Sequence, residues 1–452
     1  MIKNPLRFPG NYLVRTDFGA RGRFVVIQPI ASALPDERLM AAILRSDGVA
    51  ARQALGQMKD PVLADRFYIH GAAGNLVALT YERIKELDLE LELAPQQLSN
   101  GQPLLPALRQ QAMAAPAVSA RLDGMLAQLN DWLSELAGNV VWLKGPVLAR
   151  TLYPRPHFRL SLDLDLLVRT GAEVPVVERL IGSGFEPIWD NPGACHQTGV
   201  GPVGTIENLA IAPWKEFEFC HNLCLTRPDW PLIELKFDPL ERGLRMKELG
   251  RFFDDCRRLA WQGRTYSVPA ILDHLLLELT HLHKHGFSGW AWLYDIHLLC
   301  REVSLTPGAW AELLHRVQLE GVEASAWAAL DLVRDRLGTP VPPIVLEELK
   351  PRATGLLPRC LTFTTNPEFL WNSASLPQLW LSTCFLGDSQ RKRAALRRCM
   401  LPPRDFLSRY YLNGRPLSWW MYPVVLTVHW LVLALPGGLV RRTFGRLLWG
   451  RA

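Results

Sequence analysis

Two aspartates, Asp163 and Asp165, stand two residues apart in the alternating run SLDLDLLV at residues 161–168. Because successive side chains of a strand point to opposite faces, this run predicts a strand with both carboxylates on one face and leucines on the other. Two carboxylates this close repel each other unless a cation lies between them, and hard oxygen ligands suit Mg²⁺ bound to substrate phosphates. The run therefore indicates either a metal site or a solvent-facing strand that carries two acids.

A third carboxylate, Glu234, stands in a second alternating run, WPLIELKF at residues 230–237. Three carboxylates on neighbouring strands can hold two metal ions. The pattern is equally compatible with a surface glutamate that pairs with Lys236. Three other acids compete for the same role: Glu216, Glu218 and Asp238.

A glycine turn precedes the acidic strand. The short apolar run VVWL at 140–143 ends in Lys144 and Gly145, a helix is expected to follow, and Arg159 and Ser161 lead into the acidic strand. Gly145 lets the backbone come close to an anion, the start of a helix offers free N–H groups, and Lys144 or Arg159 can neutralise phosphate charge. The order strand, glycine turn, helix and strand predicts a phosphate site.

The elements that must hold these residues form a short α/β unit between two helical regions. Apolar residues recur at three- and four-residue spacing over 36–136, with a proline-bearing break at 93–106, and again over 268–338. Between them, residues 140–143, 161–168 and 230–237 are predicted strands. We expect an α/β (α+β) core with a small mixed sheet, flanked by N- and C-terminal all-helical regions. The expected boundaries are 1–119 (mainly helical), 120–262 (core), 263–400 (helical) and 401–452 (a basic, apolar tail).

Three segments together resemble a known family: LKGPVLARTLYPRPHFRLSLDLDLLV at 143–168, VERLIGSGFEP at 177–187 and IELKFDPL at 233–240. Their order is a glycine turn and helix, then D-x-D on a strand, then an acid on a neighbouring strand. This order is similar to that of the uncharacterised nucleotidyltransferase family of the polymerase-β-type superfamily, and the similarity extends over roughly residues 60–300. The resemblance implies that residues 120–262 form a nucleotidyltransferase-like core.

The resemblance also implies a reaction. A nucleoside monophosphate group would pass from a nucleoside triphosphate, with ATP the expected donor, to an acceptor hydroxyl or similar group, and pyrophosphate would leave. Mg²⁺ would be bound by Asp163 and Asp165, in a site able to hold two metals, and Glu234 would complete the acidic set and help activate the acceptor. The acceptor is open: a sugar, a peptide, a protein or a small molecule.

Further residues receive roles from the same resemblance. Lys144 and Gly145 would hold phosphate, and Arg159 and Ser161 would support the triphosphate. The helices that follow the core would lie beside it, and further substrate contacts are expected from Lys236, His281, His285 and Asp295.

The sequence departs from the family pattern at two places. The turn is Lys144-Gly145 where the wider superfamily has Gly-Ser, and the third-strand motif is E-x-K at 234–236 where the family often has D-x-H. The second departure favours a rival hypothesis, a catalytically weak nucleotide-binding adaptor in a membrane-proximal biosynthetic assembly. A phosphotransferase that uses the same acids is a third hypothesis.

Other motifs are weaker. The G-x-G-x-x-G spacing at 199–204 contains a proline and no helix follows it, so a turn is expected there and not a dinucleotide loop. His281 and His285 share one face of a predicted helix, but no acidic zinc ligand follows at the usual spacing. Cys220 and Cys224 have no second pair, so ordinary thiols are expected there and not a zinc knuckle.

The charge of the chain is concentrated at one end. The net charge is +6, yet residues 389–452 contain twelve Lys and Arg and one acid. Residues 418–440 have no formal charge, but Pro423 and Pro436 interrupt them, so we expect contact with an anionic membrane surface. A helix packed on protein and a true membrane span remain alternatives. A basic excess confined to one end argues against nucleic acid as a partner.

The expected compartment follows from cysteine usage. The eight cysteines show no paired rhythm, and the first residues contain no apolar run of signal-peptide length. These features predict a cytoplasmic protein with peripheral contact at the inner face of the membrane.

Overall fold

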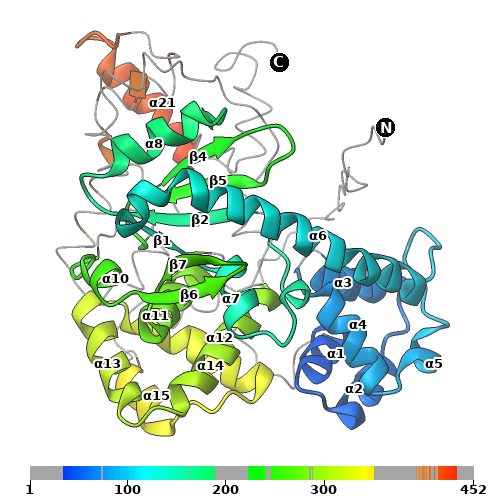
Figure 1. Ribbon diagram of the computed structural model, residues 1–452. Coiled ribbons are helices and arrows are strands. Elements are labelled where there is room, and N and C mark those ends of the chain that lie inside the picture. The colour runs from blue at the N-terminus through cyan, green and yellow to red at the C-terminus, as the bar shows by residue number, and fades with distance from the viewer. Residues whose placement is uncertain are drawn as a thin grey trace.

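The computed structural model describes residues 34–72, 75–161, 163–188, 222–240, 246–284, 289–350 and 416–434, with Phe287 and single positions between 393 and 412. The described residues 34–132 contain six α-helices. They are α1 (Pro35–Leu44), α2 (Gly48–Leu55), α3 (Pro61–Ala72), α4 (Val77–Glu86), α5 (Glu90–Leu93) and the long α6 (Leu104–Trp132). The predicted break at 93–106 is a loop that ends where α6 begins. In Figure 1, α6 extends from the N-terminal helices to the sheet.

A mixed sheet of five strands follows, which confirms the small mixed sheet expected from the sequence. Its strands are β1 (Val140–Trp142), β2 (Asp163–Val168), β3 (Glu186–Ile188), β4 (Asn222–Thr226) and β5 (Leu232–Lys236), in the order β1-β2-β5-β4-β3. Strands β2 and β5 are parallel, and the other pairs are antiparallel. The three strands predicted from the sequence are β1, from its short apolar run, and β2 and β5, from alternation. The parallel pair in the middle of the sheet brings the two acidic runs side by side.

The two faces of the sheet belong to two different cores. Leu164, Leu166 and Val168 of β2 pack with apolar residues of α6 and of α8 (Glu173–Gly182). On the opposite face, Leu167 belongs to the larger core, which also contains residues of the N-terminal helices and of the helices that follow the sheet. Since Asp163 and Asp165 alternate with the leucines of the first core, the carboxylates lie on the face of the larger core.

A two-stranded hairpin, β6 (Arg257–Trp261) and β7 (Arg264–Val268), was not predicted from the sequence. Its two-residue turn, Gln262-Gly263, has positive φ at both positions, which is the backbone of the turns that join tight hairpins. Tyr266 and Val268 pack into the core that lies with α6 and α8. The boundary expected at residue 262 falls inside this hairpin.

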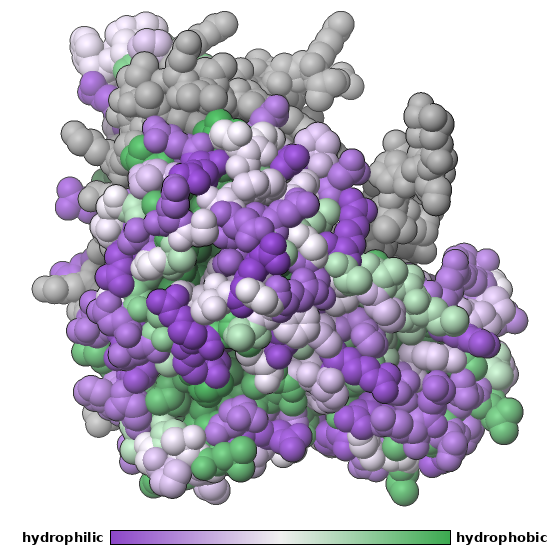
Figure 2. Space-filling model, in the orientation of Figure 1, coloured by the Kyte–Doolittle hydropathy of each residue, from purple (hydrophilic) through white to green (hydrophobic). Residues whose placement is uncertain are grey.

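The helices that follow are α11 (Ile271–Lys284), α12 (Trp290–Ser304), α13 (Ala309–Glu320), α14 (Glu323–Leu337) and α15 (Pro343–Leu349). Two short helices, α7 (Gly145–Thr151) and α10 (Arg251–Asp254), lie near β1. Gly321 and Gly338 end α13 and α14 in the left-handed conformation that glycine adopts without strain. In Figure 1, α11–α15 lie below the sheet, α8 lies at its upper end and α6 runs across it. Figure 2 shows apolar side chains gathered over these C-terminal helices.

One helix of the basic tail is described. It is α21 (Tyr422–Ala434), which has 13 residues and is drawn in orange-red at the upper left of Figure 1. Five large apolar side chains here are exposed: Trp419 and Trp420 before the helix, and Val424, Trp430 and Leu431 within it. Among the residues that the structure describes, no helix is both long enough and apolar enough to cross a membrane.

Candidate active site

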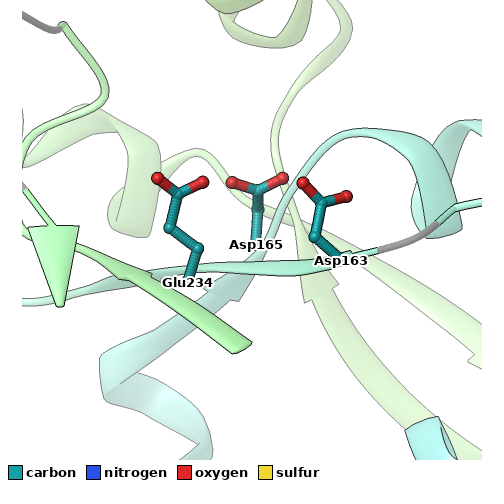
Figure 3. Close-up of side chains that lie close together, drawn as sticks. All are labelled: Asp163, Asp165 and Glu234. Carbon is teal, nitrogen blue, oxygen red and sulfur yellow. The ribbon is translucent and has the colours of Figure 1, made fainter. Parts of the chain in front are cut away.

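The three acids singled out in the sequence lie together. In the parallel pair of β2 and β5, Asp165 is the direct partner of Glu234, and Asp163 lies one strand repeat away. One carboxylate oxygen from each residue lies within 4.8 Å of the others. Figure 3 shows the three carboxylates pointing to the same side of the sheet. The alternation of the two runs thus places all three side chains on one face.

The three carboxylates differ in exposure. Asp163 is exposed, the Glu234 side chain is 13% exposed and the Asp165 side chain is 3% exposed. A ligand therefore reaches the acidic triad (Asp163, Asp165 and Glu234) from the side of Asp163. A set of donors made only of carboxylate oxygens suits a hard divalent cation such as Mg²⁺, which keeps part of its shell for water or phosphate. The residues present therefore fit the metal that the resemblance implies.

Two buried lysines contact the two less exposed members of the triad. Lys144 Nζ lies 3.2 Å from Asp165 Oδ1. Lys236 Nζ lies 3.4 Å from the same oxygen and 3.1 Å from Glu234 Oε2. Each ammonium offsets part of the repulsion between the acids, because it lies in direct contact with Asp165. The structure thus places Lys236, expected as a substrate contact or as a surface partner of Glu234, in a buried position among the acids themselves.

Asp165 experiences two opposing influences. Its burial raises the pKa of the carboxyl to about 7, while Lys144 and Lys236 act to lower it and the two other acids act to raise it. The ordinary value is 3.8. The charge on Asp165 therefore depends on the lysines, and removal of either one would favour the protonated carboxyl.

The turn before α7 has an unusual backbone. Lys144 has φ 56° and ψ −138°, a conformation that glycine adopts easily and that costs other residues about 1–3 kcal/mol. The Lys144 N–H donates to Nε2 of His274, on α11, at 3.2 Å. Burial, with Arg257 and Lys144 nearby, lowers the pKa of His274 to about 3, so the ring is neutral and its Nε2 is free to accept. Helix α11 thus holds the lysine in the conformation that contacts the triad.

Gly145 is required by the close approach of the next segment. A Cβ at this position would collide with Ser161 Oγ and would lie 3.5 Å from Cζ of Arg159. Within the described residues, no group forms a hydrogen bond with the buried Ser161 Oγ. The turn and the residues that lead into β2 therefore pack against each other. Among the described residues, the Ser161 hydroxyl has no hydrogen-bond partner.

Arg159 forms a closed cluster with two other residues. Its Nε and Nη2 lie 3.0 and 2.9 Å from Asp295 Oδ2, and Tyr153 Oη donates to Asp295 Oδ1 at 2.7 Å. All three side chains are buried. We call them the arginine cluster (Tyr153, Arg159 and Asp295). The resemblance assigns both Arg159 and Asp295 to substrate, and the structure pairs them with each other.

Of the two histidines expected to contact substrate, His281 lies on α11, further along the helix than His274. His281 is seven residues beyond His274, about 10 Å along the helix axis, and its ring meets Trp292 edge to face. His285 lies outside the described residues, as do the segment at 199–204 and Cys220. The substrate roles of His281 and His285 stay predictions.

Glu278, which was not predicted as a site residue from the sequence, is a fully buried carboxyl of α11. Burial, and then Asp295, raise its pKa to about 8, while Lys144 and Arg159 act to lower it. Within the described part of the chain, neither of its oxygens forms a hydrogen bond. A signal was present in the sequence, since His274 and Glu278 stand four residues apart in the leucine-rich run ILDHLLLELT. Charged residues are almost never fully buried without a partner, so such a pair marks a special environment.

Comparison with protein-family models finds one match, to a family described as an uncharacterised nucleotidyltransferase, over residues 60–338. This range contains the triad, both lysines, the arginine cluster and most of the helices on either side of the sheet. The chain belongs to this family. Its membership supports nucleotidyl transfer as the general activity, with a nucleotide as substrate. The comparisons with curated proteins and with solved structures found no match. The resemblance expected from the sequence over roughly 60–300 is confirmed.

Proposed function

We propose that the chain is a Mg²⁺-dependent nucleotidyltransferase that moves a nucleoside monophosphate group from a nucleoside triphosphate, with ATP as the expected donor, to an acceptor hydroxyl or similar group. The acceptor oxygen forms a bond to the α-phosphorus, the bond between this phosphorus and the bridging oxygen breaks, and pyrophosphate leaves. The observation that carries the proposal is the acidic triad, whose carboxylates lie within 4.8 Å of one another on two parallel strands. Family membership supports the reaction class.

The three acids would hold the metal. Bound Mg²⁺ supplies electrostatic stabilisation of the charge that develops on the phosphates. Asp163, the exposed member, lies where substrate enters, and Asp165 and Glu234 form the closed end. Glu234 is the candidate for accepting the acceptor's proton, because it lies beside Asp165 and is only partly buried.

The turn and the segment before β2 would position the triphosphate. The Ser161 hydroxyl is buried next to Gly145 and forms no hydrogen bond within the described residues, so it is ready to donate to a phosphate oxygen. Arg159 would act mainly through position, because its guanidinium is already bound to Asp295. The triphosphate contact thus rests more on Ser161 and Lys144 than on Arg159.

A thermal-shift experiment tests the metal-nucleotide site. The full chain is heated with ATP, GTP, CTP or UTP, with and without Mg²⁺, beside the double variant Asp163→Asn/Asp165→Asn. Ligand at about 100 Kd adds about 2.7 kcal/mol to stability, so we expect a Mg²⁺-dependent shift that the double variant loses. Asp229→Asn is the matched control, since Asp229 is exposed and has a positive φ that asparagine tolerates. An equal shift in the double variant would place the nucleotide elsewhere and reject the proposal.

The adaptor is the second candidate, and one contact favours it. Lys236 bridges Asp165 and Glu234, so part of the acidic charge is already neutralised. An adaptor binds nucleotide and releases no pyrophosphate with any acceptor, whereas the enzyme releases pyrophosphate in an acceptor screen with the nucleotide that gives the shift. Transfer of a γ-label instead of an α-label would indicate a phosphotransferase.

For the tail, we propose peripheral contact with an anionic membrane on the cytoplasmic side. Trp419 and Trp420 are 74% and 61% exposed, and tryptophan favours the membrane interface. The twelve basic residues of 389–452 would add attraction to anionic lipid. The full chain should sediment with vesicles that contain phosphatidylglycerol and not with pure phosphatidylcholine, and Trp419→Ser/Trp420→Ser should weaken this binding. Equal binding to both vesicles, or none to either, would reject the proposal.

A further inference from the structure

We propose that the Lys236 ammonium serves as a built-in cation in place of one of the two metal ions that three clustered carboxylates are able to hold. The nucleotide-loaded site then takes up a single divalent ion. This inference rests on the proposed function, and the experiment below distinguishes failure of the one from failure of the other.

The contacts of Lys236 carry the inference. Its Nζ lies 3.1 Å from Glu234 Oε2 and 3.4 Å from Asp165 Oδ1, so one ammonium connects the acids of both parallel strands. A divalent ion that bridged the same two oxygens would have to occupy the same space. The ammonium and such an ion therefore exclude each other, and one ion is left for the side of the site where Asp163, the exposed acid, lies.

The position of Lys236 is fixed by the sheet. It lies on β5, between β2 and β4, where its backbone partners are Leu167 and Asn222. Its side chain is only 2% exposed. A surface lysine would swing into water when a metal arrived, but Lys236 would have to carry its charge through the packed face of the sheet. Displacement by an entering ion is therefore unfavourable.

The charges near the triad point the same way. Lys144 also contacts Asp165, so among the residues that the structure describes two buried ammonium groups face three carboxylates, which leaves one acid in excess. This excess attracts the divalent ion that accompanies a nucleoside triphosphate, and it gives little attraction for a second one. By this inference, the E-x-K motif changes the number of metal ions that the site binds and does not abolish the site.

Counting bound ions tests the inference. Mn²⁺ is titrated, with detection of the free ion by electron paramagnetic resonance, into the full chain saturated with the non-hydrolysable analogue α,β-methylene-ATP. The expected count is one Mn²⁺ per chain for the unchanged protein and two for Lys236→Met, because methionine fills similar space without charge. Lys85→Met, at an exposed lysine, is the matched control and should keep the count at one.

Each possible count of bound Mn²⁺ either supports or overturns the inference. Two ions in the unchanged protein, or a single ion in folded Lys236→Met, overturns the inference and leaves the proposed function standing. No Mn²⁺ in any protein, even with the nucleotide analogue, rejects the proposed function as well. If Lys236→Met does not fold, Lys236→Gln replaces it, because glutamine keeps a hydrogen-bond donor for the acids without the charge. Two ions in Lys236→Gln support the inference, and one overturns it.

Discussion

The acidic triad and the arginine cluster lie on the same side of the chain's sheet, and both contain buried charges. They differ in the ratio of positive to negative groups. In the arginine cluster, one guanidinium faces one carboxylate, and a tyrosine hydroxyl satisfies a further oxygen. In the triad, three carboxylates face two ammonium groups, and one carboxylate is exposed. A balanced cluster holds elements together, whereas an acidic excess with one exposed member is ready for a cation that comes with substrate.

The largest expected effect is at the triad. Asp165→Asn replaces a metal ligand by a side chain of similar size, so turnover should fall by about 10³-fold or more. The chain should still fold, with a lower melting temperature, because buried Lys144 loses a counter-charge. The measurement is pyrophosphate release with the acceptor found in the screen, beside a thermal melt. A fully active Asp165→Asn protein would remove the triad from the mechanism. The same result for Glu234→Gln would only reassign the third acid.

A substitution in the arginine cluster should act mainly on stability. Asp295→Asn leaves the buried Arg159 guanidinium without its counter-charge, so the free energy of unfolding should fall by about 3–5 kcal/mol. Urea denaturation measures this change. The double variant Arg159→Met/Asp295→Leu should recover much of the loss, because it removes both charges. Unchanged stability in Asp295→Asn would contradict a structural role for the cluster.

Gly145 connects the two regions, since it follows Lys144, which contacts the triad, and lies close to Ser161 and Arg159. Gly145→Ala places a methyl group against Ser161, and the free energy of unfolding should fall by about 1–3 kcal/mol. Gly124→Ala is the matched control, because its added Cβ meets open space inside a helix. That control should gain about 0.5–1 kcal/mol. Equal behaviour of the two variants in urea would show that the turn does not need glycine.

The smallest expected effect concerns pH. Glu278 has a pKa of about 8 in the folded chain against an ordinary value of 4.5, so between these values the folded chain holds a proton that the unfolded chain has released. Stability therefore falls as pH rises through this range. His274, with its pKa near 3 instead of 6.5, makes stability fall as pH drops from about 6.5 toward 3.

Urea denaturation at pH 6.5 and pH 8 separates the two groups. The unchanged protein should lose up to about 2 kcal/mol between these values, and Glu278→Gln should lose less, because glutamine does not titrate. An equal loss in both proteins would mean that Glu278 is ionised at neutral pH.

The sequence predicts the part of the fold that obeys short-range periodicity. Alternation located β2 and β5 and placed Asp163, Asp165 and Glu234 on one face, while the short strands β3 and β4 were missed. Long-range partners were not readable. Arg159 was assigned to phosphate, but it pairs with Asp295, which lies 136 residues away in the chain. His274 and Glu278 stand among leucines, and nothing in helical periodicity says which turn or charge a buried polar residue will face.

Strand β2 separates the two cores, and this has a consequence for dissecting the chain. The segment 120–262 contains all three acids and would be the obvious fragment to express by itself. However, Val141, Leu143 and Leu167 of that segment are buried against helices from outside it. The isolated fragment would present this apolar surface to water and should aggregate. The segment that holds the triad is therefore not expected to be stable by itself, and any expressed fragment needs the helices on both sides of it.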